Sequence, residues 1–407
     1  MKIDLPPKVN YIINKIYENN YEAYIVGGCV RDAILGFQPN DYDITTNANP
    51  KAIKNIFKDF KCIDTGIEHG TVSVVIDYQI YEITTYRIEG EYKDHRRPQT
   101  VDFTSKLEED LKRRDFTINA MAYNEKDGLI DLFGGMIDLE NKIIKTVGNP
   151  YDRFNEDGLR MIRAIRFSSK LDFKIEDATL LAIYDNAKII KNISLERITD
   201  EFNKIIISDK PENIIYFFKT KLLNYLNISS EEDKNKIAQL FDKISILNKL
   251  DKILVKRLVV LDYLIEDLNI NCKSFCKELI YSKKIINNHN AILNLIKETD
   301  IEDLDKIKVK KILSKTDKNL FEEYLDINRV IYKDIKNIGN IVDILKAIEE
   351  NNECYTMKNL KVNGKDILDL GYENRAVGKV LDYLLEEVII NPSINEKNLL
   401  IKKIKKI

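Results

Sequence analysis

The sequence YIVGGCVRD, residues 24–32, contains the signals of a short strand, a tight turn and a helix in direct succession. Apolar residues 24–26 predict a buried strand, the two glycines predict the turn, and residues 30–35 predict a helix that Gly36 ends. Glycines at such a turn let backbone N–H groups approach a phosphate at the positive end of the helix. A phosphate site at Gly28, with the guanidinium of Arg31 beside it, is therefore one interpretation. An ordinary turn is the other.

A pair of carboxylates, Asp41 and Asp43, follows this turn. Residues 42–45 alternate as a strand does, and a period of two would place both carboxylates on the same side of that strand. Two such carboxylates can hold Mg²⁺ ions, which activate an attacking 3′ hydroxyl without a histidine base. The alternative is a hydrated turn before a strand. Glu82, on a predicted hairpin spanning residues 71–85, is the candidate for a third metal carboxylate.

Composition limits the possible classes of protein. The 407 residues include 64 Lys and Arg, 66 Asp and Glu, and 44% hydrophobic residues, with a net charge of −2. These values exclude collagen-like and mainly disordered chains, and they show no overall basic character, although a local basic surface is compatible with them. Five scattered cysteines and three isolated histidines form no disulfide framework or zinc pattern. Without a signal peptide or an apolar span, the protein is expected to be cytoplasmic, with no membrane attachment.

The chain changes character near residues 148–150. Strand and helix patterns alternate before this point, which predicts an α+β head with an antiparallel or mixed sheet. The patterns after it are almost entirely helical. We expect a head at residues 1–148, a neck at 149–205, a body at 206–300 and a tail at 301–407.

A second polar block, RRDFTINA, occupies residues 113–120. Arg114 can pair with triphosphate oxygens. Asp115 and Asn119 are four residues apart, so on a helix they would share one face and could hydrogen-bond ribose hydroxyls. The alternative is a salt-bridged helix start.

A third block follows at residues 156–166. Asp157, Arg160, Arg163 and Arg166 recur every three residues along one predicted helix, beside an apolar stripe. No acidic residues are interleaved with the three arginines, which therefore require anions from elsewhere. A surface helix with solvated arginines is the alternative.

Four blocks together resemble the class II tRNA nucleotidyltransferases, a family within the polymerase-β-like superfamily that includes CCA-adding enzymes and bacterial poly(A) polymerases. The blocks are YIVGGCVRD (24–32), DYD (41–43), RRDFTINA (113–120) and EDGLR (156–160). The clear resemblance covers about residues 20–205. It implies a polymerase-β-like nucleotidyltransferase head with a small mixed sheet, followed by an all-helical neck, body and tail.

The resemblance implies a template-independent polymerase that adds C, C and A to the 3′ end of tRNA from CTP and ATP, with Mg²⁺ as cofactor. Asp157 and Arg160 would read the incoming base, because a carboxylate accepts from the exocyclic amine of C or A and a guanidinium donates to a ring acceptor. Arg163 and Arg166 would lie near the nucleotide. Residues 194–198 resemble the family motif that supports the base-reading helix. The later helices would hold the tRNA acceptor arm by backbone and shape, in a monomer or homodimer.

Several activities remain open within this resemblance. The polar segment 87–98 resembles the mobile loop of A-adding and CCA-adding members, which disfavours addition of C alone. The charge balance argues against a poly(A) polymerase. An A-only enzyme is not separated from a full CCA-adding enzyme. A catalytically inactive tRNA-binding protein is the alternative from a different class, and the intact Asp41 and Asp43 disfavour it.

Overall fold

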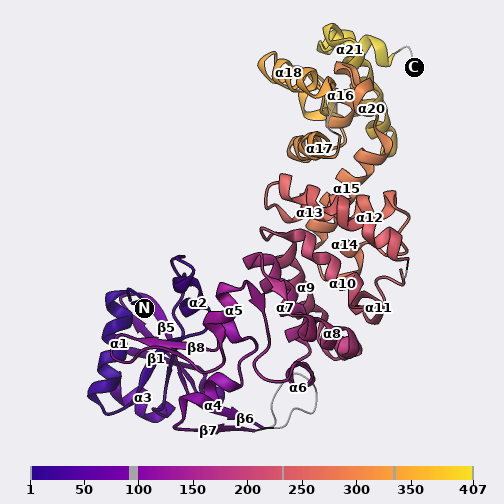
Figure 1. Ribbon diagram of the computed structural model, residues 1–407. Helices are drawn as coiled ribbons and strands as arrows, with labels where there is room; N and C mark the ends of the chain where they lie inside the picture. Colours follow the sequence, from indigo (N-terminus) through magenta and orange to yellow (C-terminus); the bar gives the residue numbers. More distant parts are fainter. Residues whose placement is uncertain (1, 91–99, 232, 333–335, 406–407) are drawn as a thin grey trace. The chain divides into compact units, whose positions relative to one another are not determined.

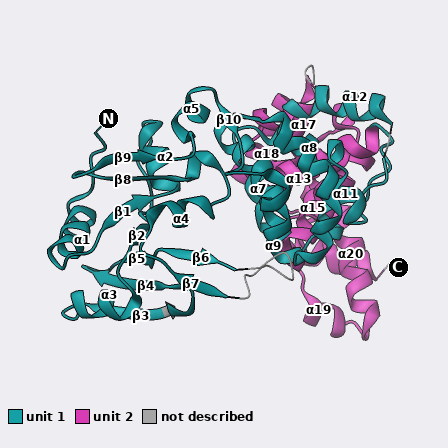
Figure 2. Cartoon of the chain, turned by 60° about the horizontal axis from the view of Figure 1, so that its bottom comes forward, with its two compact units in different colours: residues 1–245, 268–280 teal, residues 246–267, 281–407 magenta. Residues whose placement is uncertain are grey.

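The computed structural model describes residues 2–90, 100–231, 233–332 and 336–405. The chain forms two compact units (Figure 2). Unit 1 comprises Met1–Ser245 and Leu268–Ile280, and unit 2 comprises Ile246–Asp267 and Tyr281–Ile407. Every described residue of the predicted active site belongs to unit 1.

Seven strands of the described chain form one mixed sheet in the first part of unit 1 (Figure 1). Its strand order is β3-β4-β5-β2-β1-β8-β9. The pair β2–β5 is parallel, and the other neighbours are antiparallel. The strands are β1 (Ala23–Val26), β2 (Ile44–Thr46), β3 (Lys61–Gly66), β4 (Thr71–Ile76), β5 (Gln79–Thr85), β8 (Met121–Asn124) and β9 (Gly128–Asp131).

Two short strand pairs lie outside this sheet. β6 (Arg87–Glu89) pairs with β7 (Val101–Phe103) in antiparallel fashion, and β10 (Ile143–Ile144) pairs with β11 (Lys174–Ile175) in parallel. The β10–β11 pair joins the end of the head sequence to a segment that follows the base-reading block.

The central strand β1 positions the candidate site. All four of its residues are buried, so both faces of the sheet are covered there. Tyr24 and Val26 pack with Leu111 of α4 (Leu107–Lys112), together with Tyr86 and Ala122. The chain leaves this packed strand at Val26, and the glycine turn therefore projects from the middle of a rigid sheet.

Helices make up most of the remaining chain. Those of unit 1 are α1 (Pro7–Glu18), α2 (Gly28–Ile34), α3 (Pro50–Ile56), α4, α5 (Gly135–Glu140), α6 (Pro150–Glu156), α7 (Leu159–Leu171), α8 (Asp177–Asn186), α9 (Leu195–Ile206), α10 (Ile215–Lys219), α11 (Leu222–Tyr225), α12 (Lys234–Ile244) and α14 (Phe275–Glu278). Those of unit 2 are α13 (Leu254–Asp267), α15 (Lys283–Glu298), α16 (Lys306–Leu313), α17 (Lys318–Ile331), α18 (Asn337–Glu350), α19 (Gly364–Leu368), α20 (Arg375–Ile390) and α21 (Lys397–Ile404).

Unit 2 has an apolar core of its own. Near its C-terminal end, Ile367, Leu384, Val388 and Leu400 are fully buried in one cluster, which joins α19, α20 and α21. Across the described parts of the chain, no helix combines the length and apolar character that a membrane crossing requires.

The structure confirms the predicted fold class, a mixed-sheet head followed by a helical remainder. Four local expectations are wrong. The strand expected at residues 42–45 begins at Ile44, the helix expected at 30–35 begins at Gly28, and the all-helical neck contains strand β11. The loop expected at residues 87–98 starts with strand β6, because β7 supplies a pairing partner that is distant in sequence.

Candidate active site

The glycine turn is shaped by Gly27 more than by the predicted Gly28. Gly27 has a φ of +77°, and a Cβ there would lie 2.8 Å from Nη1 of Arg114. A Cβ on Gly28 would meet only an ordinary contact, 3.6 Å from Nη2 of Arg31. The left-handed conformation and the close approach of Arg114 both require glycine at position 27. Gly27 directly precedes the first residue of α2, and this position is the sequence signal that could have identified it as the essential glycine.

The acidic pair lies beside this turn. The backbone N–H of Val26 donates to the carbonyl of Asp43 at 3.0 Å, so Asp41 and Asp43 directly precede β2 without belonging to it. Although solvent reaches the Asp43 side chain, desolvation by the surrounding protein raises the pKa of its carboxyl. The charges of Asp41 and Glu82 add to this rise in pKa, and the Arg114 guanidinium opposes it. The three carboxylates and Arg114 therefore share one electrostatic environment.

The donor set at this position suits a magnesium ion. Within the described ranges, no three His, Cys, Asp or Glu side chains are grouped as metal ligands, and a third metal carboxylate at Glu82 stays a prediction. Two carboxylates are nevertheless what Mg²⁺ commonly takes from a protein, with water and substrate phosphates completing its shell. Burial, and secondly the charge of Asp43, raise the pKa of the nearby Cys29 thiol to about 12.

Arg31 is engaged inside the protein. It is 3% exposed, and its guanidinium donates to Oδ1 of Asp32 at 2.6 and 2.8 Å and to Oδ1 of Asn119 at 2.6 Å. These contacts join α2 to the short 3-10 helix Thr117–Asn119. A nucleotide contact of Arg31 stays a prediction from the sequence.

Asp115 and Asn119 lie together, but not on the helical face that their spacing predicts. Asp115 is in an irregular segment, and Nδ2 of Asn119 donates to its Oδ1 at 3.1 Å. The other oxygen accepts Nε and Nη2 of Arg163 at 2.8 and 2.5 Å. Burial alone would raise the pKa of Asp115, but Arg163, Asn119 and, more weakly, Arg160 hold it at about 2.

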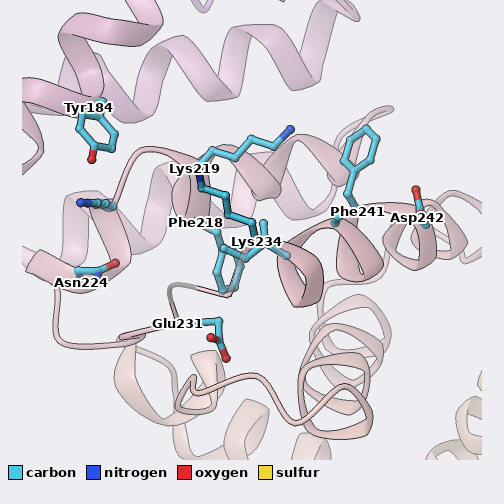
Figure 3. A pocket seen from close by; sticks show the side chains of 11 residues that line it. Tyr184, Phe218, Lys219, Asn224, Glu231, Lys234, Phe241 and Asp242 are labelled. Atoms are coloured by element: carbon cyan, nitrogen blue, oxygen red, sulfur yellow. The ribbon is translucent and has the colours of Figure 1, made fainter.

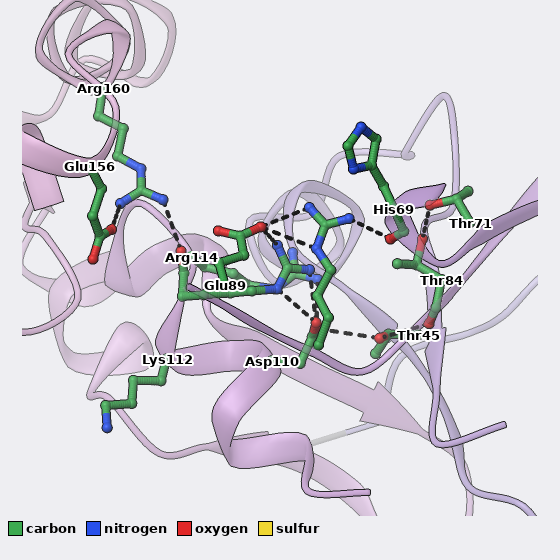
Figure 4. Close-up of polar contacts among 12 residues, drawn as sticks. Thr45, His69, Thr71, Thr84, Glu89, Asp110, Lys112, Arg114, Glu156 and Arg160 are labelled. Carbon is green, nitrogen blue, oxygen red and sulfur yellow. Dashed lines mark hydrogen bonds and ion pairs between the residues drawn. The ribbon is translucent and has the colours of Figure 1, made fainter. Parts of the chain in front are cut away.

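Arg114 lies between the glycine turn and a buried carboxylate in α4. Asp110 is fully buried and pairs with Arg113 at 2.8 Å and with Arg114 at 3.4 Å, while the hydroxyl of Thr45 donates to it at 3.3 Å (Figure 4). The sequence interpretation missed Asp110. Its spacing of three and four residues before two arginines is the signal that could have revealed it.

The Nε–H group of Arg114 is buried and, in the described part of the chain, has no hydrogen-bond partner. A buried donor without a partner is rare in native proteins and calls for an explanation such as a ligand. An oxygen of a bound anion beside Gly27 would satisfy it.

The base-reading block is split between two helices. α6 ends at Glu156, and Asp157 has an extended backbone before α7 begins at Leu159. The expectation of one helix carrying Asp157 and all three arginines is therefore wrong. A Cβ on Gly158, between the two helices, would lie 2.9 Å from Cγ2 of Ile189, so the close packing at this junction favours glycine.

Each carboxylate oxygen of Asp157 accepts a hydrogen bond from another part of the protein. Oδ1 accepts the backbone N–H of Leu159 at 3.0 Å, and Oδ2 accepts Nη2 of Arg197 at 3.2 Å. Arg197 belongs to the segment 194–198 that was expected to support this block. Each oxygen keeps capacity for another donor.

Arg160 is 7% exposed, and three hydrogen bonds hold its guanidinium group in one orientation. Nη1 donates to the carboxylate of Glu156 at 2.5 Å and to the carbonyl of Arg153 at 3.3 Å, and Nη2 donates to the carbonyl of Arg113 at 3.0 Å (Figure 4). These bonds connect the arginine to the RRD block. They also leave some of its N–H groups for another acceptor.

Each of the three arginines of α7 pairs with an acidic residue that lies outside residues 160–166. Arg160 pairs with Glu156, Arg163 with Asp115, and Arg166 with Glu201 in α9, at 2.5 Å. Glu201 is 4% exposed and was missed by the sequence interpretation, because it lies far along the chain. The guanidiniums of Arg166 and Arg163 also lie over the ring of Phe167, 3.9 and 5.4 Å from its centroid.

The β6–β7 hairpin contacts the same network. Glu89 of β6 accepts from Arg87 at 2.8 Å and from Arg113 at 3.1 Å (Figure 4). Residues 91–98 of the predicted loop, including Asp94 and Arg97, lie outside the described residues. The part that is described thus connects to Arg113, whose carbonyl holds Arg160.

Comparison with known proteins yields matches along the whole chain. A family model described as the poly A polymerase head domain matches residues 23–145, and one described as a probable RNA and SrmB-binding site of polymerase A matches residues 172–229. The CCA-adding enzyme of Ligilactobacillus salivarius is 37% identical, over 97% of this chain and 95% of its own length. That of Lacticaseibacillus paracasei is 52% identical over 53% of this chain and 54% of its own.

A solved structure shows the same correspondence. The CCA-adding enzyme of Bacillus stearothermophilus, in complex with CTP, superimposes with a TM-score of 0.79 and 30% identity, covering 99% of both chains.

Proposed function

The chain belongs to the family of CCA-adding enzymes, the tRNA nucleotidyltransferases, and we propose that it adds C, C and A to tRNA at one site formed by the glycine turn, the acidic pair and the α6–α7 junction. All three features lie in unit 1 and share the network around Arg113 and Arg114. One set of residues would therefore serve both CTP and ATP.

The observation that carries this proposal is the environment of Arg114. Its Nε is buried without a partner, Gly27 leaves room for it by lacking a Cβ, and it acts electrostatically on Asp43. A triphosphate whose oxygens meet this guanidinium would bring its phosphates next to the two carboxylates. This arrangement supports binding of a nucleotide with its reacting phosphate at the acidic pair.

Members of this family use a divalent metal ion, and we propose Mg²⁺ for this chain, held by Asp41 and Asp43. When bound there, Mg²⁺ would lower the pKa of the attacking 3′ hydroxyl and neutralise charge on the transferred phosphate. Arg114 would contribute further positive charge on the triphosphate, and its ion pair with Asp110 would keep it oriented.

Base selection is proposed for Asp157 and Arg160. The bonds to Glu156 and to two backbone carbonyls orient Arg160 before substrate arrives, and Arg197 does the same for Asp157. The remaining acceptor of the carboxylate and donor of the guanidinium match C and A, whereas U and G present the opposite groups. Orientation in advance supports discrimination, because the wrong base leaves these groups unpaired.

The ribose contact is proposed for Asn119 in preference to Asp115. The Asp115 carboxylate already accepts Asn119, Arg163 and the N–H of Phe116, which uses its acceptor capacity. Asn119 retains an amide hydrogen beyond the one given to Asp115. Arg31, Arg163 and Arg166 would then act by positioning Asn119, Asp115 and Phe167.

The test uses a tRNA transcript lacking its three terminal nucleotides, Mg²⁺ and single labelled nucleotides. We expect Asp41→Asn and Asp43→Asn to lose both C and A incorporation by at least about a hundredfold, since loss of the metal removes several kcal/mol of charge stabilisation. Asp77→Asn is the matched control, because Asp77 is an exposed carboxylate of the same sheet at a hairpin turn. Glu82→Gln tests the third carboxylate.

The wild-type products separate the alternatives. Incorporation of A alone, onto a transcript ending in CC, would identify an A-only enzyme. Long A tails on unrelated RNA would identify a poly(A) polymerase, and tRNA binding without incorporation would identify an inactive relative. A cytoplasmic location, a monomeric or homodimeric state, contact with the acceptor arm and the four domain boundaries stay predictions from the sequence.

A further inference from the structure

A pocket of about 630 Å³ lies in unit 1 among α8, α10, α11 and α12. It shares no residue with the candidate active site, and its volume lies in the range of small-molecule sites. The side chains used below are Tyr184, Lys219, Lys221, Lys234 and Phe241, which we call the basic aromatic pocket.

Two of its aromatic rings are open to solvent. Tyr184 is 40% and Phe241 45% exposed, and they lie on opposite sides of the pocket (Figure 3). The ammonium of Lys219 is 4.8 Å from the centroid of Phe241, and that of Lys221 is 4.9 Å from the centroid of Tyr184. Each ring thus has a cation beside it, which is the pairing expected where an aromatic anion binds.

The charge of the pocket is positive. Among the described residues, Lys219 and Lys234 have no carboxylate within ion-pair distance, and two lining residues, Glu231 and Asp242, are acidic. Glu231 accepts the backbone N–H groups of Asp233 and Asn271, both at 2.9 Å, and these bonds lower its pKa. Lys236, which does not line the pocket, lies 3.5 Å from this carboxylate and offsets its charge, so Lys219 and Lys234 are left to attract an anion.

We propose that the basic aromatic pocket binds one unstacked nucleotide of the RNA substrate, with its base against Phe241 and its phosphate at Lys219. The proposal rests on the proposed function for the identity of the RNA. Stacking on aromatic side chains together with lysine contacts to phosphates is how proteins hold single-stranded nucleotides without reading their sequence. Such tolerance suits an enzyme that accepts many tRNAs.

Three observations favour a nucleotide within RNA over a free one. Lys219, Lys221 and Lys234 come from three successive segments, so they can follow a phosphodiester backbone. The described residues that line the pocket include no arginine, the residue that holds a terminal phosphate in a bidentate manner. In addition, Tyr184, Lys219 and Lys221 fall within residues 172–229, the part matched by the RNA-binding family model.

The experiment measures equilibrium binding of the full chain to two fluorescent RNAs, a tRNA transcript lacking its three terminal nucleotides and a blunt RNA duplex. Phe241→Leu keeps apolar volume but removes the ring, and Phe241→Tyr is the matched control that keeps it. We expect Phe241→Leu to weaken tRNA binding about tenfold, as loss of one base stack does, and Phe241→Tyr to bind like wild type. At saturating tRNA, kcat for C addition should be unchanged in both variants.

Lys219→Gln tests the phosphate contact. The slope of log Kd against log salt concentration should fall by about one, the value for one lost phosphate contact. An unchanged slope would contradict the proposed phosphate contact. The duplex is the control for Phe241→Leu. Because the duplex has no unpaired base, this variant should bind it with the affinity of wild type.

Three further results would overturn the proposal. The first is that Phe241→Leu binds tRNA with the affinity of wild type. The second is that Phe241→Leu weakens binding of the duplex and of the tRNA equally, which would mean that the pocket contacts only the RNA backbone. Equilibrium dialysis could reveal a second ATP per chain that Phe241→Leu abolishes, which would assign the pocket to a free nucleotide. If wild type adds no nucleotide while Phe241→Leu still weakens tRNA binding, the proposed function fails and the pocket proposal stands.

Discussion

The ion pair between Arg163 and Asp115 allows a quantitative test of the site's construction. Asp115 is 8% exposed, yet its pKa is lowered from the usual 3.8 to about 2. Burial by itself acts in the opposite direction, and Arg163 is the largest of the groups that overcome it. One pKa unit corresponds to about 1.4 kcal/mol, so the ionised carboxylate stabilises the fold by about 2 kcal/mol at neutral pH.

The substitution Arg163→Met keeps the length of the side chain and leaves a buried carboxylate without its cation. We expect the free energy of unfolding at neutral pH to fall by about 2 to 5 kcal/mol, the upper end being typical when one partner of a buried pair is removed. In wild type, the contribution of Asp115 is present above its unfolded pKa and is lost as the pH falls from 3.8 through about 2.

The pH dependence of the variant has the opposite sign. Without Arg163, burial raises the pKa of Asp115, and protonation of the folded state then restores stability as the pH falls. The difference between wild type and Arg163→Met should therefore be largest at neutral pH and smaller at about pH 5. Urea unfolding followed by far-ultraviolet circular dichroism measures both values.

Two further variants test the assignment. Adding Asp115→Asn to Arg163→Met should recover part of the loss, because the unpaired charge is gone. Arg329→Met breaks the exposed pair with Asp326 and should change stability little. A difference between wild type and Arg163→Met that is the same at both pH values, or a double variant as unstable as Arg163→Met, would refute the electrostatic role of this pair.

Three other outcomes are expected. Gly27→Ala should lower the melting temperature and kcat/KM for CTP, because the new Cβ meets Arg114 and the positive φ costs about 1 kcal/mol; a variant equal to wild type in both would contradict the tight turn. Asp110→Asn should raise KM for CTP and ATP about tenfold by releasing Arg114, and a KM unchanged in steady-state assays would exclude Asp110 as its anchor. Arg160→Ala should raise kcat/KM for UTP and GTP relative to CTP about tenfold. Equal ratios would end the base-reading assignment.

Local sequence was enough to predict the head and its motifs. The glycine turn, the acidic pair and the arginines of α7 are patterns within a few residues, where chain geometry alone brings side chains together. The same applies to the hairpin β4–β5 and to the change from alternating to helical patterns. Family resemblance across four such blocks then pointed to the activity that the relatives share.

The partners of those motifs depend on packing between distant segments. Arg163 and Asp115 are 48 residues apart, and Asp157 and Arg197 are 40 apart; no periodicity connects such positions. Burial in the folded chain also changes what each group can do, because desolvation makes an unpaired charge costly and forces Arg166 to pair with Glu201. Local composition thus specified which chemical groups this protein carries, and long-range packing specified which of them are tied up within the fold and which are left for substrate.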